Sequence, residues 1–140
     1  MGLSAGVEPM RITTGPRDSA MRNARVCYNH LAGNKGIQLH DALIANRYLK
    51  QNSGELVLTR KGSHFMQEFG IDLDSLQASR TPMCRPCLDW SERRSHLAGS
   101  LGRALMAKFE QLRWVKRDGN SRVVKFSAKG EREFNSTFSP

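Results

Sequence analysis

The sequence predicts an α+β fold, predominantly helical, in which two similar units, each with a helix-turn-helix and a β-hairpin, pack into one compact body. Three observations support this prediction: an internal repeat, apolar residues at helical spacing, and turn residues followed by β-branched residues. The chain has 140 residues, 39% of them hydrophobic, which is enough for one ordinary domain or for two very small ones that share a core.

The other predictions depend on the repeat. The run His30–Gly36 returns 66 residues later as His96–Gly102, with five of seven residues identical. Further along, Leu58–Gly62 resembles Phe126–Gly130 at an offset of 68. Each copy is therefore predicted to have the same order of elements, namely helix, turn, helix, hairpin and helix.

Apolar spacing predicts the two helices of each helix-turn-helix. In the first copy, one helix ends near Gly33 and carries on one face Ala24, Cys27, Tyr28 and Leu31. The next helix has an apolar stripe at Leu39, Ala42, Leu43 and Leu49, matched in the second copy by Leu101, Ala104, Leu105, Phe109 and Leu112. Residues 89–94 are expected to open the first helix of the second copy.

A hairpin and a capped helix complete each copy. The turns are predicted at residues 52–54 and 118–120, and β-branched residues follow each turn. Thr59 and Ser127 are placed to cap the helices that come next, because their hydroxyl oxygens can accept from backbone N–H groups.

The resulting domain organisation has four segments. Residues 1–20 are expected to be a flexible N-terminal arm or linker, because glycine and proline are frequent there. The first unit covers residues 21–73, a connector covers 74–86, and the second unit covers 87–140.

The charge balance favours a polyanionic partner. Lys and Arg number 22 against 13 Asp and Glu, and the excess lies in residues 21–70 and 91–140. Such a surface attracts nucleic acid, although a basic surface can also serve solubility only. The sequence has neither an apolar run long enough to span a membrane nor a signal peptide, so a cytoplasmic protein without membrane contact is expected. Its three cysteines are then expected to stay reduced.

Two longer strings carry a resemblance to a known family. A helix-turn-helix followed by a hairpin that ends in Leu-Thr-x-x-Gly is the layout of winged-helix DNA-binding domains. Residues 27–33 (CYNHLAG) and 87–99 (CLDWSERRSHLAG), with the lead-in at 14–18 (TGPRD), resemble the C-terminal half of bacterial ArsR-type transcriptional regulators. The resemblance implies two tandem winged-helix-like units, regulation of transcription, DNA as partner and a homodimer. The N-terminal winged helix of that group is not found in this sequence, so a trimmed regulator or a stand-alone C-terminal half is expected.

Basic residues of the second hairpin and its neighbours are the predicted DNA contacts. They are Arg103, Lys108, Arg113, Lys116, Arg117, Arg122, Lys125 and Lys129, joined by Arg47 in the first copy. Contacts of this kind hold a duplex by its phosphates without reading bases. The alternative is a solvated surface that touches no DNA.

Cysteine and histidine residues form a second candidate site. Cys27-x-x-His30 and Cys84-x-x-Cys87 have metal-ligand spacing, and His96 is a further candidate. These ligand types favour zinc or another thiophilic metal ion. The alternatives are a buried apolar role for Cys27 and, for His30 and His96, a place at helix C-termini where they interact with the helix dipole.

The sequence predicts that the chain is not an enzyme, because none of the common catalytic motifs is found and no small-molecule substrate can be identified. A transcriptional regulator that associates with DNA through basic residues is the leading prediction. The alternative is a metal-sensing, ligand-sensing or dimerisation module of an ArsR-type regulator with no DNA contact of its own.

Overall fold

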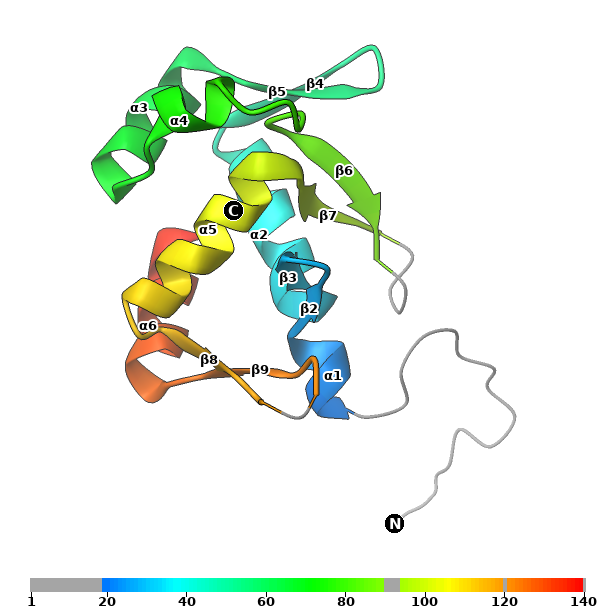
Figure 1. The fold of residues 1–140 in the computed structure, drawn as a ribbon, viewed down its shortest axis with the longest axis vertical. Coiled ribbons are helices and arrows are strands. Elements are labelled where there is room, and N and C mark those ends of the chain that lie inside the picture. The colour runs from blue at the N-terminus through cyan, green and yellow to red at the C-terminus, as the bar shows by residue number, and fades with distance from the viewer. Residues whose placement is uncertain (1–18, 90–93, 120, 140) are drawn as a thin grey trace.

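The computed structural model describes residues 19–89, 94–119 and 121–139 (Figure 1). The described chain is α+β, as predicted, and its elements follow one another as α1 Ser19–Asn23, β2 Arg25–Cys27, β3 His30–Ala32, α2 Gly33–Ala45, β4 Leu49–Asn52, β5 Glu55–Leu58, α3 Arg60–Phe69, α4 Leu73–Gln77, β6 Arg85–Leu88, β7 Ser95–Ala98, α5 Gly99–Gln111, β8 Val115–Arg117, β9 Val124–Phe126 and α6 Ala128–Thr137. We call residues 25–69 the first half and residues 85–137 the second half. Both halves have the order hairpin, helix, hairpin and helix.

The predicted first helix of each copy is wrong, because a β-hairpin stands in its place. In the first half β2 pairs antiparallel with β3, and Tyr28 in the turn has a φ of 58°. Apolar residues of this stretch meet across the hairpin instead, as Val26 does with Leu31. In the second half β6 pairs with β7, and residues 90–93 between them lie outside the described residues.

This difference changes the fold prediction. A hairpin precedes each central helix, so the chain shows no helix-turn-helix at residues 24–45, and tandem winged-helix units are not confirmed. Nor is a predominantly helical fold confirmed. His30 and His96 lie on strands β3 and β7, so the prediction that they end helices and interact with helix dipoles is also wrong.

The remaining elements agree well with the sequence predictions. The second amphipathic helices are α2 and α5, although Leu49 belongs to β4 rather than to the helix. The hairpins β4–β5 and β8–β9 are present. Both predicted caps are confirmed, since Thr59 Oγ1 accepts from Gly62 N and Ser127 Oγ accepts from Gly130 N, each at 2.9 Å. Of the predicted arm at residues 1–20, residues 1–18 lie outside the described residues, and the last two begin α1.

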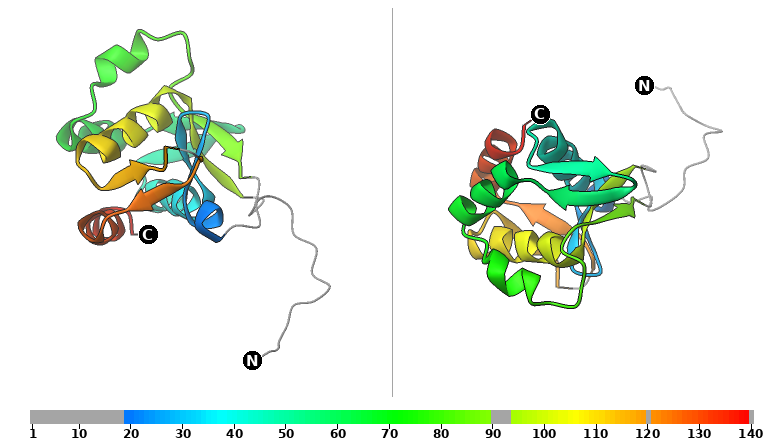
Figure 2. Two further views of the ribbon diagram at one scale, coloured as in Figure 1. Left: turned by 60° about the horizontal axis from the view of Figure 1, so that its bottom comes forward. Right: turned by 90° about the horizontal axis from the view of Figure 1, so that it is seen from above.

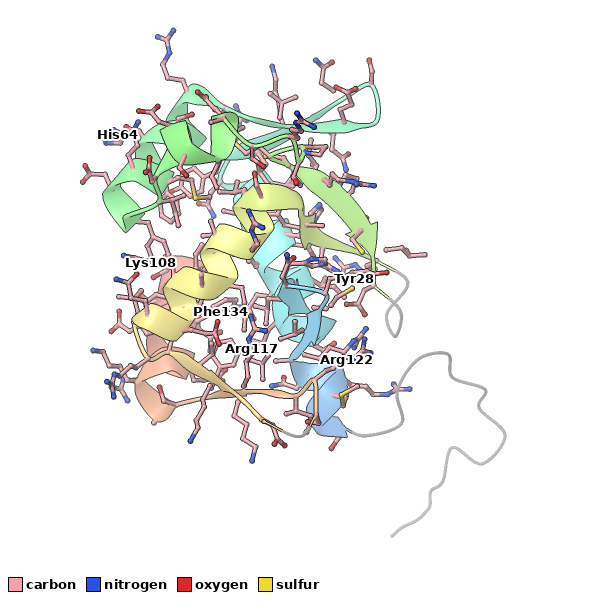
Figure 3. The ribbon with its side chains drawn as sticks, in the orientation of Figure 1. Tyr28, His64, Lys108, Arg117, Arg122 and Phe134 are labelled. Atoms are coloured by element: carbon pink, nitrogen blue, oxygen red, sulfur yellow. The ribbon has the colours of Figure 1, made fainter. Side chains whose placement is uncertain are left out.

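The two halves exchange their packing partners. Helix α2 of the first half packs against β7 of the second, and α5 of the second half packs against β3 of the first. The two helices therefore cross near the middle of the molecule, with the hairpins β4–β5 and β8–β9 at opposite ends (Figure 1). Aromatic side chains extend the shared core, because Phe69 of α3 meets Phe109 and Trp114 of the second half edge to face. Phe134 of α6 is fully buried in this core (Figure 3).

Hairpins of the two halves lie edge to edge in two places, and the two places differ in backbone hydrogen bonding. Near β9, the chain is joined to β2 by backbone hydrogen bonds, Val26 N to Arg122 O at 2.9 Å and Val124 N to Ala24 O at 3.0 Å. At the opposite end β6 runs beside β5 (Figure 2), but the described residues show no hydrogen-bonded pairing between them. A groove lies there instead, lined on one side by residues 54–58 and on the other by residues 82–86. None of the described helices is both long and apolar enough to cross a lipid bilayer.

Candidate metal centre

Two cysteines and two histidines come together where the first hairpins of the two halves meet. The candidate ligand atoms of the four residues all lie within 4.8 Å of one another, and the residues are Cys27, His30, Cys87 and His96. Each half supplies one cysteine and one histidine as a directly paired couple across its hairpin, Cys27 opposite His30 and Cys87 opposite His96. We call these four residues the metal-ligand group.

Two glycines allow the hairpins and helices to approach closely enough to form this group. A Cβ atom on Gly36 would lie 2.5 Å from Leu31 O and 3.4 Å from His96 Cβ. The corresponding atom on Gly102 would lie 2.6 Å from Leu97 O and 3.3 Å from His30 Cβ. Each glycine therefore brings the first turn of a central helix against the histidine of the other half.

The donor set fits a tetrahedral ion. His30 and His96 are buried, and their Nε2 atoms lie 2.9 Å apart. Around zinc, bonds of about 2.0–2.3 Å at tetrahedral angles separate neighbouring ligand atoms by about 3.3–3.8 Å. The two Nε2 atoms are slightly closer than this, and no two of the four ligand atoms are more than 4.8 Å apart, so modest side-chain shifts suffice to enclose an ion. Two thiolates and two imidazoles are also the ligand types that zinc takes in closed sites.

Asp89 orients one member of the metal-ligand group by a hydrogen bond. The sequence analysis did not identify it as a site residue. Its side chain is completely buried. One carboxylate oxygen accepts from His96 Nδ1 at 3.1 Å and from Gly33 N at 2.7 Å, and the other accepts from Arg25 Nη2 at 3.2 Å. The bond to Nδ1 directs His96 Nε2 toward the other ligands, as carboxylates do for metal-bound histidines. The sequence signal was an aspartate two residues after a candidate ligand.

Burial shifts the pKa values of three members of the group, His30, His96 and Cys87, toward their neutral forms. Burial, with a smaller contribution from His96, lowers the pKa of His30 to about 4. The pKa of His96 is also lowered by burial, against the opposing effect of Asp89. Burial and the neighbouring Cys27 raise the pKa of the Cys87 thiol to about 11. Neutral imidazoles are ready to bind a cation, and a bound dication would reverse the thiol shift by stabilising thiolates.

The predicted ligand set is brought together except for one residue. Cys84 precedes β6 and lines the groove beside β5, so it is not a member of the metal-ligand group. Burial raises the pKa of its thiol to about 11. His64 lies on α3, on the opposite side of the molecule from Tyr28, which stands beside the metal-ligand group (Figure 3). His40 is buried on α2 and, within the described residues, its Nε2 atom has no hydrogen-bond partner.

The predicted DNA contacts are spread over several surfaces. Four of them line one groove beside the exposed hairpin β8–β9, namely Arg113, Lys116, Arg117 and Lys125. Arg117 Nε in this groove donates to Glu110 Oε2 at 3.0 Å. The other five lie elsewhere: Arg103 beside the metal-ligand group, Lys108 against Gly70, Arg122 between β8 and β9, Lys129 on α6, and Arg47 after α2. In Figure 3 Lys108 and Tyr28 lie on opposite sides of the molecule.

Comparison with known proteins found a transcriptional regulator. The chain is 35% identical over 111 residues to a Bacillus subtilis (strain 168) protein named an uncharacterized HTH-type transcriptional regulator, YdfF. The alignment covers 79% of this chain and 49% of the relative, so the chain spans about half the length of the relative it matches. No family model matches the sequence, and no solved structure matches it. The similarity supports a transcriptional-regulator family, without singling out the ArsR type.

Proposed function

We propose that this chain is a metal-binding domain of an HTH-type transcriptional regulator and that its metal-ligand group holds one zinc ion. The convergence of four ligand atoms from two hairpins within 4.8 Å carries the proposal. Four protein ligands close a tetrahedral site, and closed sites serve structure or sensing rather than catalysis. Because each half supplies one cysteine and one histidine, a bound ion ties the two halves together.

Metal content of the purified protein tests this proposal. Mass spectrometry of the metals is expected to find one zinc per chain, and cobalt substitution is expected to give the visible absorption of tetrahedral thiolate ligation. Cys87→Ser removes a ligand and is expected to abolish both signals. Cys84→Ser is the matched control, because Cys84 lies outside the group, and it is expected to keep them. An equal loss in both variants, or no metal in the zinc-reconstituted protein, would overturn the proposal.

A second function is favoured by the groove beside β8–β9. Its four basic side chains are exposed, and three of them lie on the hairpin strands: Lys116, Arg117 and Lys125. A protein surface of this kind neutralises DNA phosphates, and the name of the relative adds support. We infer that this groove contacts the phosphate backbone of duplex DNA. We also infer that the regulator is a homodimer, because proteins of this class bind paired half-sites as dimers.

Fluorescence anisotropy with a random-sequence duplex tests DNA contact. Affinity is expected to fall linearly with the logarithm of salt concentration, and Lys116→Ala is expected to reduce that slope by about one. Lys50→Ala is the matched control, because Lys50 is the exposed residue at the corresponding place of hairpin β4–β5. No binding at low salt, or equal effects of the two variants, would contradict a DNA-contacting groove.

A further inference from the structure

A pocket of about 300 Å³ opens directly beside the metal-ligand group. Two of the candidate ligands, His30 and Cys87, form part of its wall. Exposed Tyr28 at the tip of hairpin β2–β3 stands at its edge (Figure 3). Two arginines, Arg85 of β6 and Arg103 of α5, line the pocket as well. Neither arginine forms an ion pair within the described part of the chain.

Under the internal repeat, this pocket lies at the position equivalent to the site that the Asp89 carboxylate occupies. The strand register aligns the hairpins, because the pair Arg25 and Ala32 matches the pair Arg85 and Ala98. Counting from the paired cysteines, Asn29 then corresponds to Asp89. The first residues of the central helices, Gly33 and Gly99, correspond as well.

The donors around Asp89 have counterparts that line the pocket. The Asp89 carboxylate accepts from the side chains of Arg25 and His96 and from the backbone N–H of Gly33. The counterparts of these three donors are Arg85, His30 and Gly99, and all three line the pocket. The residue in the place of the aspartate is Asn29, which is exposed and has no carboxylate. The pocket thus repeats a carboxylate-binding arrangement without a carboxylate from the described chain.

We propose that this pocket binds the carboxylate of a small organic acid, held by Arg85, the Gly99 N–H group and His30 Nδ1. Arg103 adds a second positive charge, so a dicarboxylate fits better than a monocarboxylate. The pocket-lining residue Ser100 offers a further donor, since its hydroxyl is buried and has no hydrogen-bond partner among the described residues. The N–H groups of Ser100 and Leu101 donate to Pro82 O and Met83 O, so recognition depends on the side chains named above and on Gly99 N–H rather than on the rest of the helix end.

Metal binding at the neighbouring group favours this recognition through His30, and this part rests on the proposed zinc site. Without an ion, His96 donates through Nδ1 to Asp89, so its Nε2 atom can only accept, and His30 Nε2 must donate to it. The Nδ1 atom of neutral His30 is then an acceptor. When Nε2 binds a metal, the ring proton is on Nδ1, which becomes a donor to a carboxylate.

Isothermal calorimetry with succinate on the zinc-loaded full chain tests the proposal. Saturable binding of succinate is expected, with none for succinamide, its uncharged counterpart. Arg85→Ala is expected to weaken binding by at least about tenfold, because a charge-assisted hydrogen bond is lost. Asn29→Asp places a carboxylate of the chain itself against the same donors and is expected to abolish binding. Arg80→Ala, which changes an exposed arginine outside the pocket, is expected to leave affinity unchanged.

The outcomes separate this proposal from the zinc site. Zinc content and the circular dichroism of each variant are measured in parallel, so that unfolding is recognised. Succinate binding that depends on Arg85 in a chain that holds no zinc supports a carboxylate pocket formed by Arg85 and Gly99, and it removes both the metal site and the donor role of His30 Nδ1. One zinc per chain with no succinate binding, binding of succinamide as tight as that of succinate, or equal losses in Arg85→Ala and Arg80→Ala would overturn the carboxylate pocket.

Discussion

The first hairpin of each half contributes one cysteine and one histidine to the metal-ligand group, but the arginine two residues before the cysteine has a different environment in each half. Arg25 is buried and paired with Asp89, whereas its counterpart Arg85 is exposed. The residues at the corresponding turn positions, Asp89 and Asn29, differ by one charge. The presence or absence of one carboxylate therefore distinguishes the two halves. In one half the donors are occupied by Asp89 in the core, and in the other the equivalent donors line an open pocket.

The largest expected difference between the halves is in Asp89→Ala compared with Asn29→Ala. Removing Asp89 takes the carboxylate away from buried Arg25 and from two further donors, which costs about 3–5 kcal/mol of unfolding free energy. Asn29 is exposed, so its replacement is expected to change stability by less than about 0.5 kcal/mol. Urea unfolding measures both, and similar values for the two variants would refute the assigned asymmetry.

Metal removal tests whether the two hairpins depend on each other. With zinc at about a thousandfold excess over its dissociation constant, binding adds about 4 kcal/mol to the free energy of unfolding. A chelator is therefore expected to lower the thermal midpoint of the wild-type chain. Cys27→Ser, which removes a ligand, should no longer respond to the chelator, while Cys84→Ser should respond as the wild type does. A chelator response that survives in Cys27→Ser would be incompatible with the metal-ligand group.

The glycine contacts are predicted to be alike in the two halves. Gly36→Ala and Gly102→Ala each force a Cβ atom against a backbone carbonyl oxygen, at an expected cost of about 1–3 kcal/mol. Gly119→Ala is the control, because no atom lies within 4 Å of a Cβ atom built there. Chemical denaturation of the three variants is the measurement. A neutral Gly36→Ala beside a costly Gly102→Ala would show that the halves do not pack equivalently.

The smallest effect is expected at an ion pair that joins the two halves and is not repeated by the corresponding residues, Leu101 and Ser63. Lys35 of α2 pairs with Glu131 of α6, and the corresponding position on α3 is Ser63. The hydrogen bond from Lys35 lowers the pKa of Glu131. A lowered carboxyl pKa stabilises the fold above the unfolded value of about 4.3, and this contribution is lost as the pH falls through the folded value.

Glu131→Gln measures this contribution. Because the Glu131 side chain is 46% exposed, water screens the pair, and the variant is expected to lose only about 0.5 kcal/mol at pH 7. The difference from wild type should disappear as the pH falls through the folded pKa of Glu131, since both chains are then uncharged at residue 131. A larger loss at low pH than at neutral pH would contradict this sign.

Local pattern was sufficient for the elements whose signals lie close together in the chain. The amphipathic stripe of Leu39 and Leu43 predicted α2, and Thr59 and Ser127 predicted two caps, because side chains a few residues apart decide these features. Spacing also identified four of the candidate metal ligands. It wrongly predicted a helix at residues 24–31, because the spacing of apolar residues alone does not distinguish a short helix from a tight hairpin such as β2–β3.

Residue types and short spacings thus specified the repeated units, their caps and the chemistry of the candidate ligands. The exchange of packing partners between the halves decided which ligands meet, why Cys84 stays apart, and why Asp89 rather than Asn29 is buried. These outcomes involve contacts between residues about 60 positions apart. No local pattern records such contacts, because they form only when both hairpins have packed against the opposite helices.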